Sequence, residues 1–170
     1  NASNWVVKGT AGNPAFRVDY NYPALPSLNP LHNSYSNQTN YVNTINGTYS
    51  DGIGIGLSVL KIQIKSIEAT PRYIYWTGSG NKFAWNTTAT NWLDVSGGGT
   101  PYTLSGGNFN INLGTTDFGQ IAHSFDINWL LTDTLGNTTT VTGTRRFEVN
   151  RDMNIPQNLS NGLDMTLDSI

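Results

Sequence analysis

The chain has 170 residues, a formal net charge of −2 and charged side chains at only 12% of its positions, which suits one domain with a single buried core. Its basic residues are scattered, apart from Arg145, Arg146 and Arg151, and this argues against nucleic acid as a partner. The sequence contains no cysteine, which excludes disulfides, thiolate catalysis and most structural zinc sites.

The polarity of the chain comes mainly from Asn, Ser, Thr and Gly. Together with residues that favour pleated strands, this composition is typical of a β protein with a neutral polar exterior. No apolar run approaches the roughly 18 residues of a membrane span, and no charged-then-apolar leader opens the chain, so the sequence looks like a mature or excised piece. We expect an extracellular protein, on a cell surface or a virion, without membrane insertion.

Residues 1–50 are predicted to form an irregular N-terminal arm that packs on or beyond the domain. Four of them are proline, a residue that breaks both helices and central strands: Pro14, Pro23, Pro26 and Pro30. Residues 16–22 alternate and residues 39–45 are extended in character, so each of the two segments could form a short strand. Residues 23–38 between them are expected to form a long irregular loop.

A β-sandwich core is predicted over residues 51–150. Apolar residues from Ile53 to Val59 share one parity and those from Leu60 to Ile64 share the other, which indicates a β-bulge or a bend between sheets. Short strands with aromatic or alternating apolar residues follow, separated by Gly-rich turns. Residues 121–149 then alternate on both sides of a turn, which predicts a β-hairpin.

Eight or so strands without a convincing helix predict an all-β fold, an antiparallel β-sandwich with Ig-like or jelly-roll topology. Residues 151–170 contain Pro156 and Gly162 and show little periodicity. We expect them to form a C-terminal tail.

Residues 125–142 resemble the last two strands of bacterial and archaeal extracellular Ig-like and fibronectin-type modules. In those modules an Asp-x-x-Gly-Asn turn, here Asp133, Gly136 and Asn137, joins two alternating strands. The segment around Trp92 and the Gly-rich connection after it are similar to the middle of such a module. The resemblance covers about residues 60–149 and implies a spacer, adhesive or carbohydrate-binding role without catalysis.

Few titratable residues are candidates for catalysis. Glu68 and Glu148 are the only glutamates, and a carboxylate pair is what a small β-jelly-roll glycosidase would use. His123 has the parity of Phe125 and Ile127, which is more typical of a hydrogen-bonded strand residue than of a general base. We therefore expect no enzyme, no catalytic residue and no cofactor, with a glycosidase as the lesser alternative.

Oxygen ligands for Ca²⁺ are available in two places, Asp133 with Asn137 and Asp117 with Asp126. The position of Asp133 is explained by the alternative that its carboxylate caps its own turn, and we prefer that interpretation. We therefore expect no metal site.

Aromatic residues offer a candidate binding surface. Tyr73 and Tyr75 alternate with Ile74 and Trp76, so we expect the tyrosines on an exposed face and Trp76 in the core. Sugar rings stack on such aromatic side chains. The glycan-binding candidates are therefore Tyr73, Tyr75 and Trp92.

The predicted function is that of a non-catalytic structural or adhesive protein in a surface assembly. Its arm and tail are longer than a plain spacer needs, so we expect them to contact copies of the chain or other surface-protein subunits. A carbohydrate-binding module is the alternative. Six Asn-X-Ser/Thr sequons occur, little above the roughly four that chance gives, so glycosylation is only weakly indicated.

Overall fold

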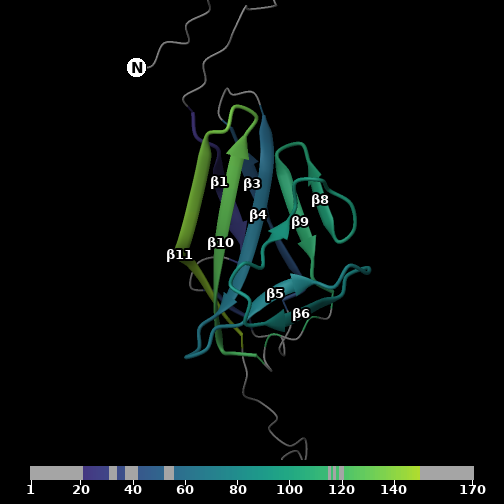
Figure 1. Cartoon of the computed structure of the whole chain (residues 1–170), viewed down its shortest axis with the longest axis vertical. Helices are drawn as coiled ribbons and strands as arrows, with labels where there is room; N and C mark the ends of the chain where they lie inside the picture. Colours follow the sequence, from purple (N-terminus) through teal and green to yellow (C-terminus); the bar gives the residue numbers. More distant parts are fainter. Residues whose placement is uncertain are drawn as a thin grey trace, which may run out of the picture.

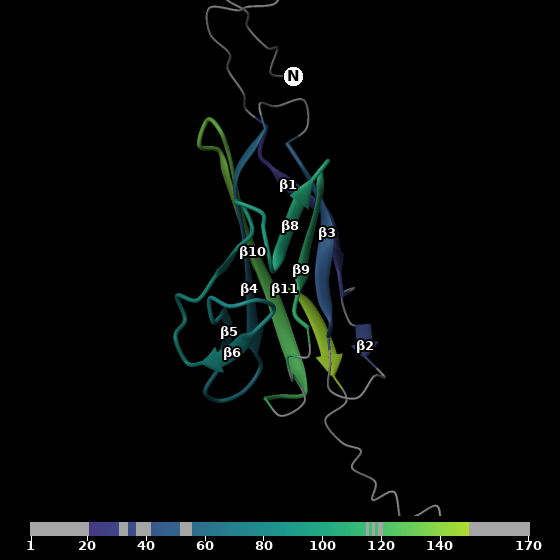
Figure 2. The ribbon, with the colours of Figure 1, turned by 90° about the vertical axis from the view of Figure 1, so that its right-hand side faces the viewer.

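The computed structural model describes residues 21–30, 34–36, 42–51, 56–114, 116, 118 and 121–149. Every regular element in this part of the chain is a β-strand, and the strands form two sheets packed on a shared core. Figures 1 and 2 show the two layers in views that differ by 90°. The prediction of an all-β sandwich is confirmed.

The first sheet is antiparallel and has the strand order β1-β3-β9-β8. Its members are β1 (Ala24–Asn29), β3 (Thr44–Ser50), β9 (Asn108–Asn112) and β8 (Tyr102–Ser105). Alternate residues along these strands, such as Leu28, Ile45 and Ile111, are buried in the core. The sheet therefore has one apolar face and one face toward solvent.

From Ser27 onward in β1, and throughout the other three strands, the solvent side of this sheet carries only small neutral polar side chains. We call these positions the neutral face: Ser27, Asn29, Thr44, Asn46, Thr48, Ser50, Thr103, Ser105, Asn108, Asn110 and Asn112. The four strands contain no charged residue at all.

The second sheet has the order β2-β11-β10-β4-β5-β6, and β7 pairs with β4 off this path. The strands are β2 (Ser34–Ser36), β11 (Thr138–Val149), β10 (Ser124–Asp133), β4 (Leu57–Ser66), β5 (Tyr73–Trp76), β6 (Phe83–Asn86) and β7 (Leu93–Asp94). All pairs are antiparallel except that of β2 with β11.

Of the two predicted topologies, the strand order is the Ig-like one. Strands β1, β3, β9 and β8 take the places of A, B, E and D, and strands β11, β10, β4, β5 and β6 take those of G, F, C, C′ and C″. The disulfide that links strands B and F in antibody domains has no counterpart, because the chain lacks cysteine.

Aromatic rings form a cluster in the buried core. Phe118, Phe125 and Phe147 are almost fully buried. The ring centroid of Phe125 lies 5.0 Å from that of Phe118 and 5.4 Å from that of Phe147. Trp85 of β6 packs on the same cluster, with its centroid 5.1 Å from that of Phe118. The cluster therefore joins three strands of the second sheet in the core.

The predicted change of phase in β4 is confirmed as a β-bulge. Val59 pairs with Thr132 and Leu57 pairs with Asp133, so Ser58 is an extra residue between them. The Ser58 hydroxyl donates to the carbonyl oxygens of Thr132 and Asp133, at 3.0 and 2.6 Å. The residues that precede this bulge, 52–55, lie outside the described residues.

The sandwich begins before the predicted boundary at residue 51. Strands β1 and β3 lie in the segment predicted as an arm and contribute Leu28 and Ile45 to the core. β1 tolerates Pro26 because it is an edge strand whose pairing shifts register between Ala24 and Ser27. Residues 1–20 and 150–170, which contain the rest of the predicted arm and the predicted tail, lie outside the described residues.

Gly47 is expected to be indispensable for the packing of β1 on β3. A Cβ at this position would lie 2.1 Å from the Ser27 carbonyl oxygen and 2.9 Å from a ring carbon of Phe109. Gly47→Ala should therefore lower the free energy of unfolding by about 1–3 kcal/mol, measured by urea denaturation. Gly97→Ala is the matched control, because a Cβ there meets nothing within 4 Å, and it should stay within about 0.5 kcal/mol. Equal stability of both variants would contradict this packing.

Candidate functional site

Aromatic side chains from both sheets surround a hollow of about 360 Å³, which we call the aromatic hollow. Its lining consists of Tyr75, Trp76, Thr90, Asn91, Trp92, Leu93, Asp94 and Tyr102. Two further hollows, of about 430 and 350 Å³, are lined by at most one aromatic residue each. The aromatic hollow is therefore the candidate functional site in the described part of the chain.

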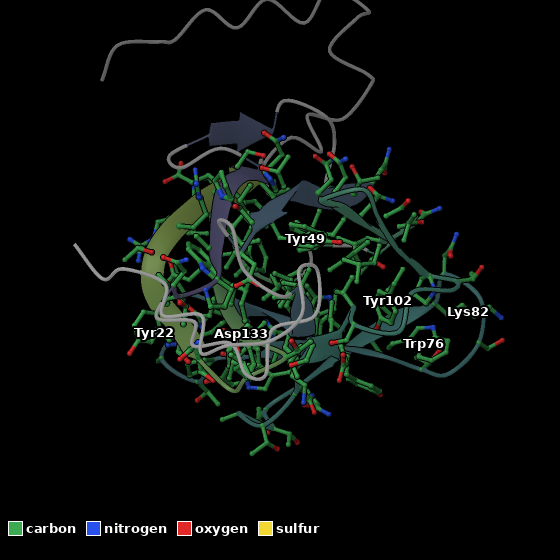
Figure 3. The ribbon with its side chains drawn as sticks, turned by 90° about the horizontal axis from the view of Figure 1, so that it is seen from above. Tyr22, Tyr49, Trp76, Lys82, Tyr102 and Asp133 are labelled. Atoms are coloured by element: carbon green, nitrogen blue, oxygen red, sulfur yellow. The ribbon has the colours of Figure 1, made fainter. Side chains whose placement is uncertain are left out.

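The aromatic hollow lies where the second sheet divides. β5 pairs with β4 only at Lys65, whereas β7 pairs with β4 at Lys61 and Ile62. The lining residues of β5 and of residues 90–94 thus meet Tyr102, which belongs to the edge strand β8 of the other sheet. Figure 3 shows Trp76 and Tyr102 next to each other. Their ring centroids are 6.0 Å apart at an interplanar angle of 66°.

Hydrogen bonds hold the ring-bearing segments in place. The indole N–H of Trp76 donates to the Gly80 carbonyl oxygen at 2.8 Å. On the other side, the Gln63 amide nitrogen of β4 donates to the carbonyl oxygens of Ala89 and Asn91, at 2.8 and 3.3 Å. Because Gln63 is buried and also accepts a bond from Asn128, it fixes the loop that leads to Trp92.

Asp94 gives the aromatic hollow a negative charge. Burial raises the pKa of its carboxyl group, but hydrogen bonds from Ser96 and the ammonium group of Lys61, 3.6 Å away, outweigh burial and leave the pKa below its ordinary value. Burial and the charge of Asp94 raise the pKa of Tyr102 to about 12. At neutral pH the site therefore presents a carboxylate acceptor and a protonated phenol.

Two of the three glycan-binding candidates line the aromatic hollow. Tyr75 and Trp92 are among its lining residues, whereas Tyr73 lies elsewhere, paired with Lys65 of β4 and Asn86 of β6. Trp76 packs against the core as expected, but it is only partly buried and also lines the hollow. No sequence pattern pointed to Tyr102, because its place depends on the pairing of β8 with β9.

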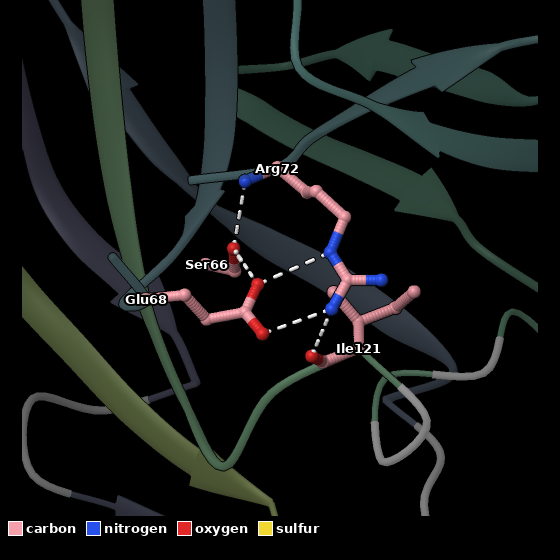
Figure 4. Close-up of polar contacts among 4 residues, drawn as sticks. All are labelled: Ser66, Glu68, Arg72 and Ile121. Carbon is pink, nitrogen blue, oxygen red and sulfur yellow. Dashed lines mark hydrogen bonds and ion pairs between the residues drawn. The ribbon is translucent and has the colours of Figure 1, made fainter. Parts of the chain in front are cut away.

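The two glutamates have different side-chain partners. Glu68 forms a bidentate pair with Arg72, with nitrogen–oxygen distances of 3.1 and 2.9 Å (Figure 4). Arg72 also donates to the Ile121 carbonyl oxygen, and the Ser66 hydroxyl donates to Glu68 at 2.9 Å. This network ties the turn after β4 to the segment before β10.

Glu148, by contrast, lies 3.5 Å from the imidazole Nε2 of His123. Both side chains of this pair are almost half exposed. Glu68 and Glu148 therefore take part in separate side-chain contacts in the structure.

Asp133 caps its own turn, as the sequence predicted. One carboxylate oxygen accepts the backbone N–H groups of Leu135 and Asn137, at 2.8 and 2.9 Å, and the other accepts the Asn137 amide at 2.5 Å. Burial raises the pKa of Asp133, but these hydrogen bonds outweigh burial and lower it.

No cluster of three or more potential His, Cys, Asp or Glu ligands occurs among the described residues. Asp126, the second Ca²⁺ candidate, pairs instead with Arg146, at 3.0 Å between Oδ1 and Nε. Its proposed companion Asp117 lies outside the described residues.

Asp133→Ala should lower the free energy of unfolding by about 1–3 kcal/mol at pH 7, because two backbone N–H groups lose their acceptor. A carboxylate with a lowered folded-state pKa stabilises the fold above its unfolded pKa of about 3.9, and this contribution is lost as the pH falls through the folded pKa. The difference between wild type and variant should therefore narrow below pH 4 in urea denaturation.

Leu135→Ala, in the same turn but at an exposed position, should have little effect on stability and serves as the control. A rise of several degrees in the wild-type melting temperature with added Ca²⁺, absent in Asp133→Ala, would instead favour the metal site.

Asparagines of the described sequons take part in local hydrogen bonds. The Asn137 amide nitrogen, the atom that glycosylation would modify, donates to Asp133. The Asn86 side-chain oxygen accepts bonds from Thr88 and Asn91, at 2.8 and 2.6 Å. These residues thus have structural roles that explain their presence.

The described residues contain no helix long and apolar enough to cross a membrane. Comparison with family models, with curated proteins and with solved structures finds no match to this chain. The aromatic hollow itself is therefore the basis for a proposed function.

Proposed function

We propose that this chain is a non-catalytic adhesive β-sandwich module that binds a neutral glycan in the aromatic hollow. The observation that carries the proposal is the convergence of four aromatic side chains with Thr90, Asn91 and Asp94 around one hollow. The aromatic rings offer apolar faces to a sugar ring, and the polar groups offer partners to its hydroxyls. The Ig-like strand order supports, as analogy, an extracellular adhesive module of the kind the hairpin resembles.

The lining of the site favours a neutral ligand over an acidic one, because the Asp94 carboxylate lines the hollow whereas its ion-pair partner Lys61 does not. Asp94 is the one charged residue that lines the hollow, and a uronic acid or sialic acid would meet its carboxylate. The hydroxyl groups of a neutral sugar instead donate to that carboxylate and to the Asn91 amide oxygen. Binding of a glycan, without cleavage of any bond in it, is enough to account for the residues that line the hollow.

Trp92→Ala should weaken binding to a neutral glycan at least about tenfold, or about 1.4 kcal/mol, because it removes one wall of the aromatic hollow. Binding is measured by affinity electrophoresis and calorimetry on xylan, mixed-linkage β-glucan, mannan and cellulose. Tyr73→Ala is the matched control. Tyr73 is an aromatic residue of β5, the strand that carries Tyr75 and Trp76, but it does not line the hollow.

Wild-type affinity in the Tyr73→Ala variant and reduced affinity in Trp92→Ala are the expected results. The proposal fails if wild type binds none of the four polymers, or if both variants bind alike.

Contacts between subunits are a second proposed role, favoured by the way β2 is attached. This three-residue strand pairs in parallel with β11 and forms the edge of the second sheet, so a segment of the N-terminal part of the chain already extends a sheet through main-chain bonds. The same kind of addition between copies, or to another surface protein, joins subunits without a new fold.

Removing residues 1–20 and 150–170 should leave the described strands intact and abolish self-association. The measurement is light scattering on a sizing column for the full chain and for the chain of residues 21–149. An oligomeric full chain and a folded monomeric short chain are expected. The same number of chains per particle for both, with equal melting temperature, would exclude these ends as assembly elements.

A further inference from the structure

The neutral face is an ordered surface that the proposed function does not use. Charged strand residues of the described chain lie in the second sheet, for example Lys61, Lys65, Asp126 and Arg146. The four strands of the first sheet contain none. A ligand on the neutral face thus displaces water from amides and hydroxyls only, which costs far less than desolvating a charge.

The side chains of the neutral face are ordered by hydrogen bonds with one another. The Asn29 amide donates to Asn46 at 3.1 Å, and the Ser27 and Thr48 hydroxyls share a bond of 2.9 Å. Each amide and hydroxyl has capacity for further bonds, because each carries both donor and acceptor sites. The face therefore presents fixed groups that match the hydroxyls of a sugar chain.

A row of these residues leads away from the aromatic hollow. Tyr102, which lines the hollow, is followed in β8 by Thr103, whose side chain lies on the opposite face of the strand. Thr103 pairs with Asn110, Asn110 with Asn46, and Asn46 with Asn29. At about 4.8 Å per strand the row spans about 14 Å, the length of roughly three sugar rings.

A shallow hollow of about 350 Å³ opens beside this row. It is lined by Asn46, Gly47, Thr48 and Asn108, with Ser27 and Phe109.

We propose that the neutral face continues the glycan site: a polysaccharide with one sugar in the aromatic hollow passes around β8 and lies across the row from Thr103 to Asn29. This inference rests on the proposed function. A second copy of the chain fits the face less well, because four strands of this length offer about 400 Å². A stable interface buries about 800 Å² per partner.

The test is the dependence of affinity on chain length, measured by calorimetry with di-, tri- and hexasaccharides of the polymer that wild type binds best. Wild type should bind the hexasaccharide at least about tenfold more tightly than the disaccharide. The double variant Asn46→Ala, Asn110→Ala should lose at least about fivefold for the hexasaccharide and less than twofold for the disaccharide. Thr140→Ala, an exposed position of β11 in the other sheet, should change neither affinity.

The outcomes separate the two proposals. If the double variant binds the hexasaccharide as tightly as wild type does, the neutral face has no role in binding. If Trp92→Ala at the same time binds both the disaccharide and the hexasaccharide more weakly, the aromatic hollow remains the binding site. Unchanged affinities in Trp92→Ala, or no binding by wild type, overturn both. A change in oligomeric mass of the double variant on a sizing column assigns the face to contacts between copies and overturns the inference. Equal melting temperatures show that the double variant is folded.

Discussion

The packing of buried apolar side chains between the two sheets is the interaction on which the rest of the structure depends. An Ig-like sandwich without cysteine has no covalent link between its sheets, so burial of apolar surface must hold them together. Phe118, Phe125 and Phe147 form the centre of that core, and Trp85 extends it to β6. Through Trp85, the β5–β6 hairpin is anchored to the core although it pairs with β4 at one residue only.

This anchoring explains how the aromatic hollow arises. Since β5 leaves β4 after Lys65 and β7 takes its place at Lys61, the sheet divides next to an edge strand of the other sheet. Gln63 lies between these two points and holds the loop before Trp92 with its side chain. A buried amide therefore positions an aromatic side chain that a continuous sheet would not place there.

Sequence periodicity predicted the structural features that depend on residues close together in the chain. The strands of the hairpin, the bulge at Ser58 and the turn capped by Asp133 all follow from local parity or turn chemistry. Strand β1 did not, because Pro26 made residues 23–38 look like an irregular loop. The strands β8 and β9 were expected, but their place beside β3 was not, because it depends on pairing between distant segments. Only part of the site was predicted from the sequence. Tyr75 and Trp92 were recognised as aromatic candidates, whereas Tyr102 belongs to a strand of the other sheet and reaches the hollow only through the fold.

The absence of charge from the first sheet also bears on how its edges avoid pairing with other chains. Edge strands are commonly protected by lysine or other charged residues, which β1 and β8 lack. Here β8 is only four residues long, and β1 carries Pro26 and a shift in register. Short length, proline and irregular pairing supply the protection that charges would otherwise give. The solvent side of the sheet is thereby left entirely to neutral hydrogen-bonding groups.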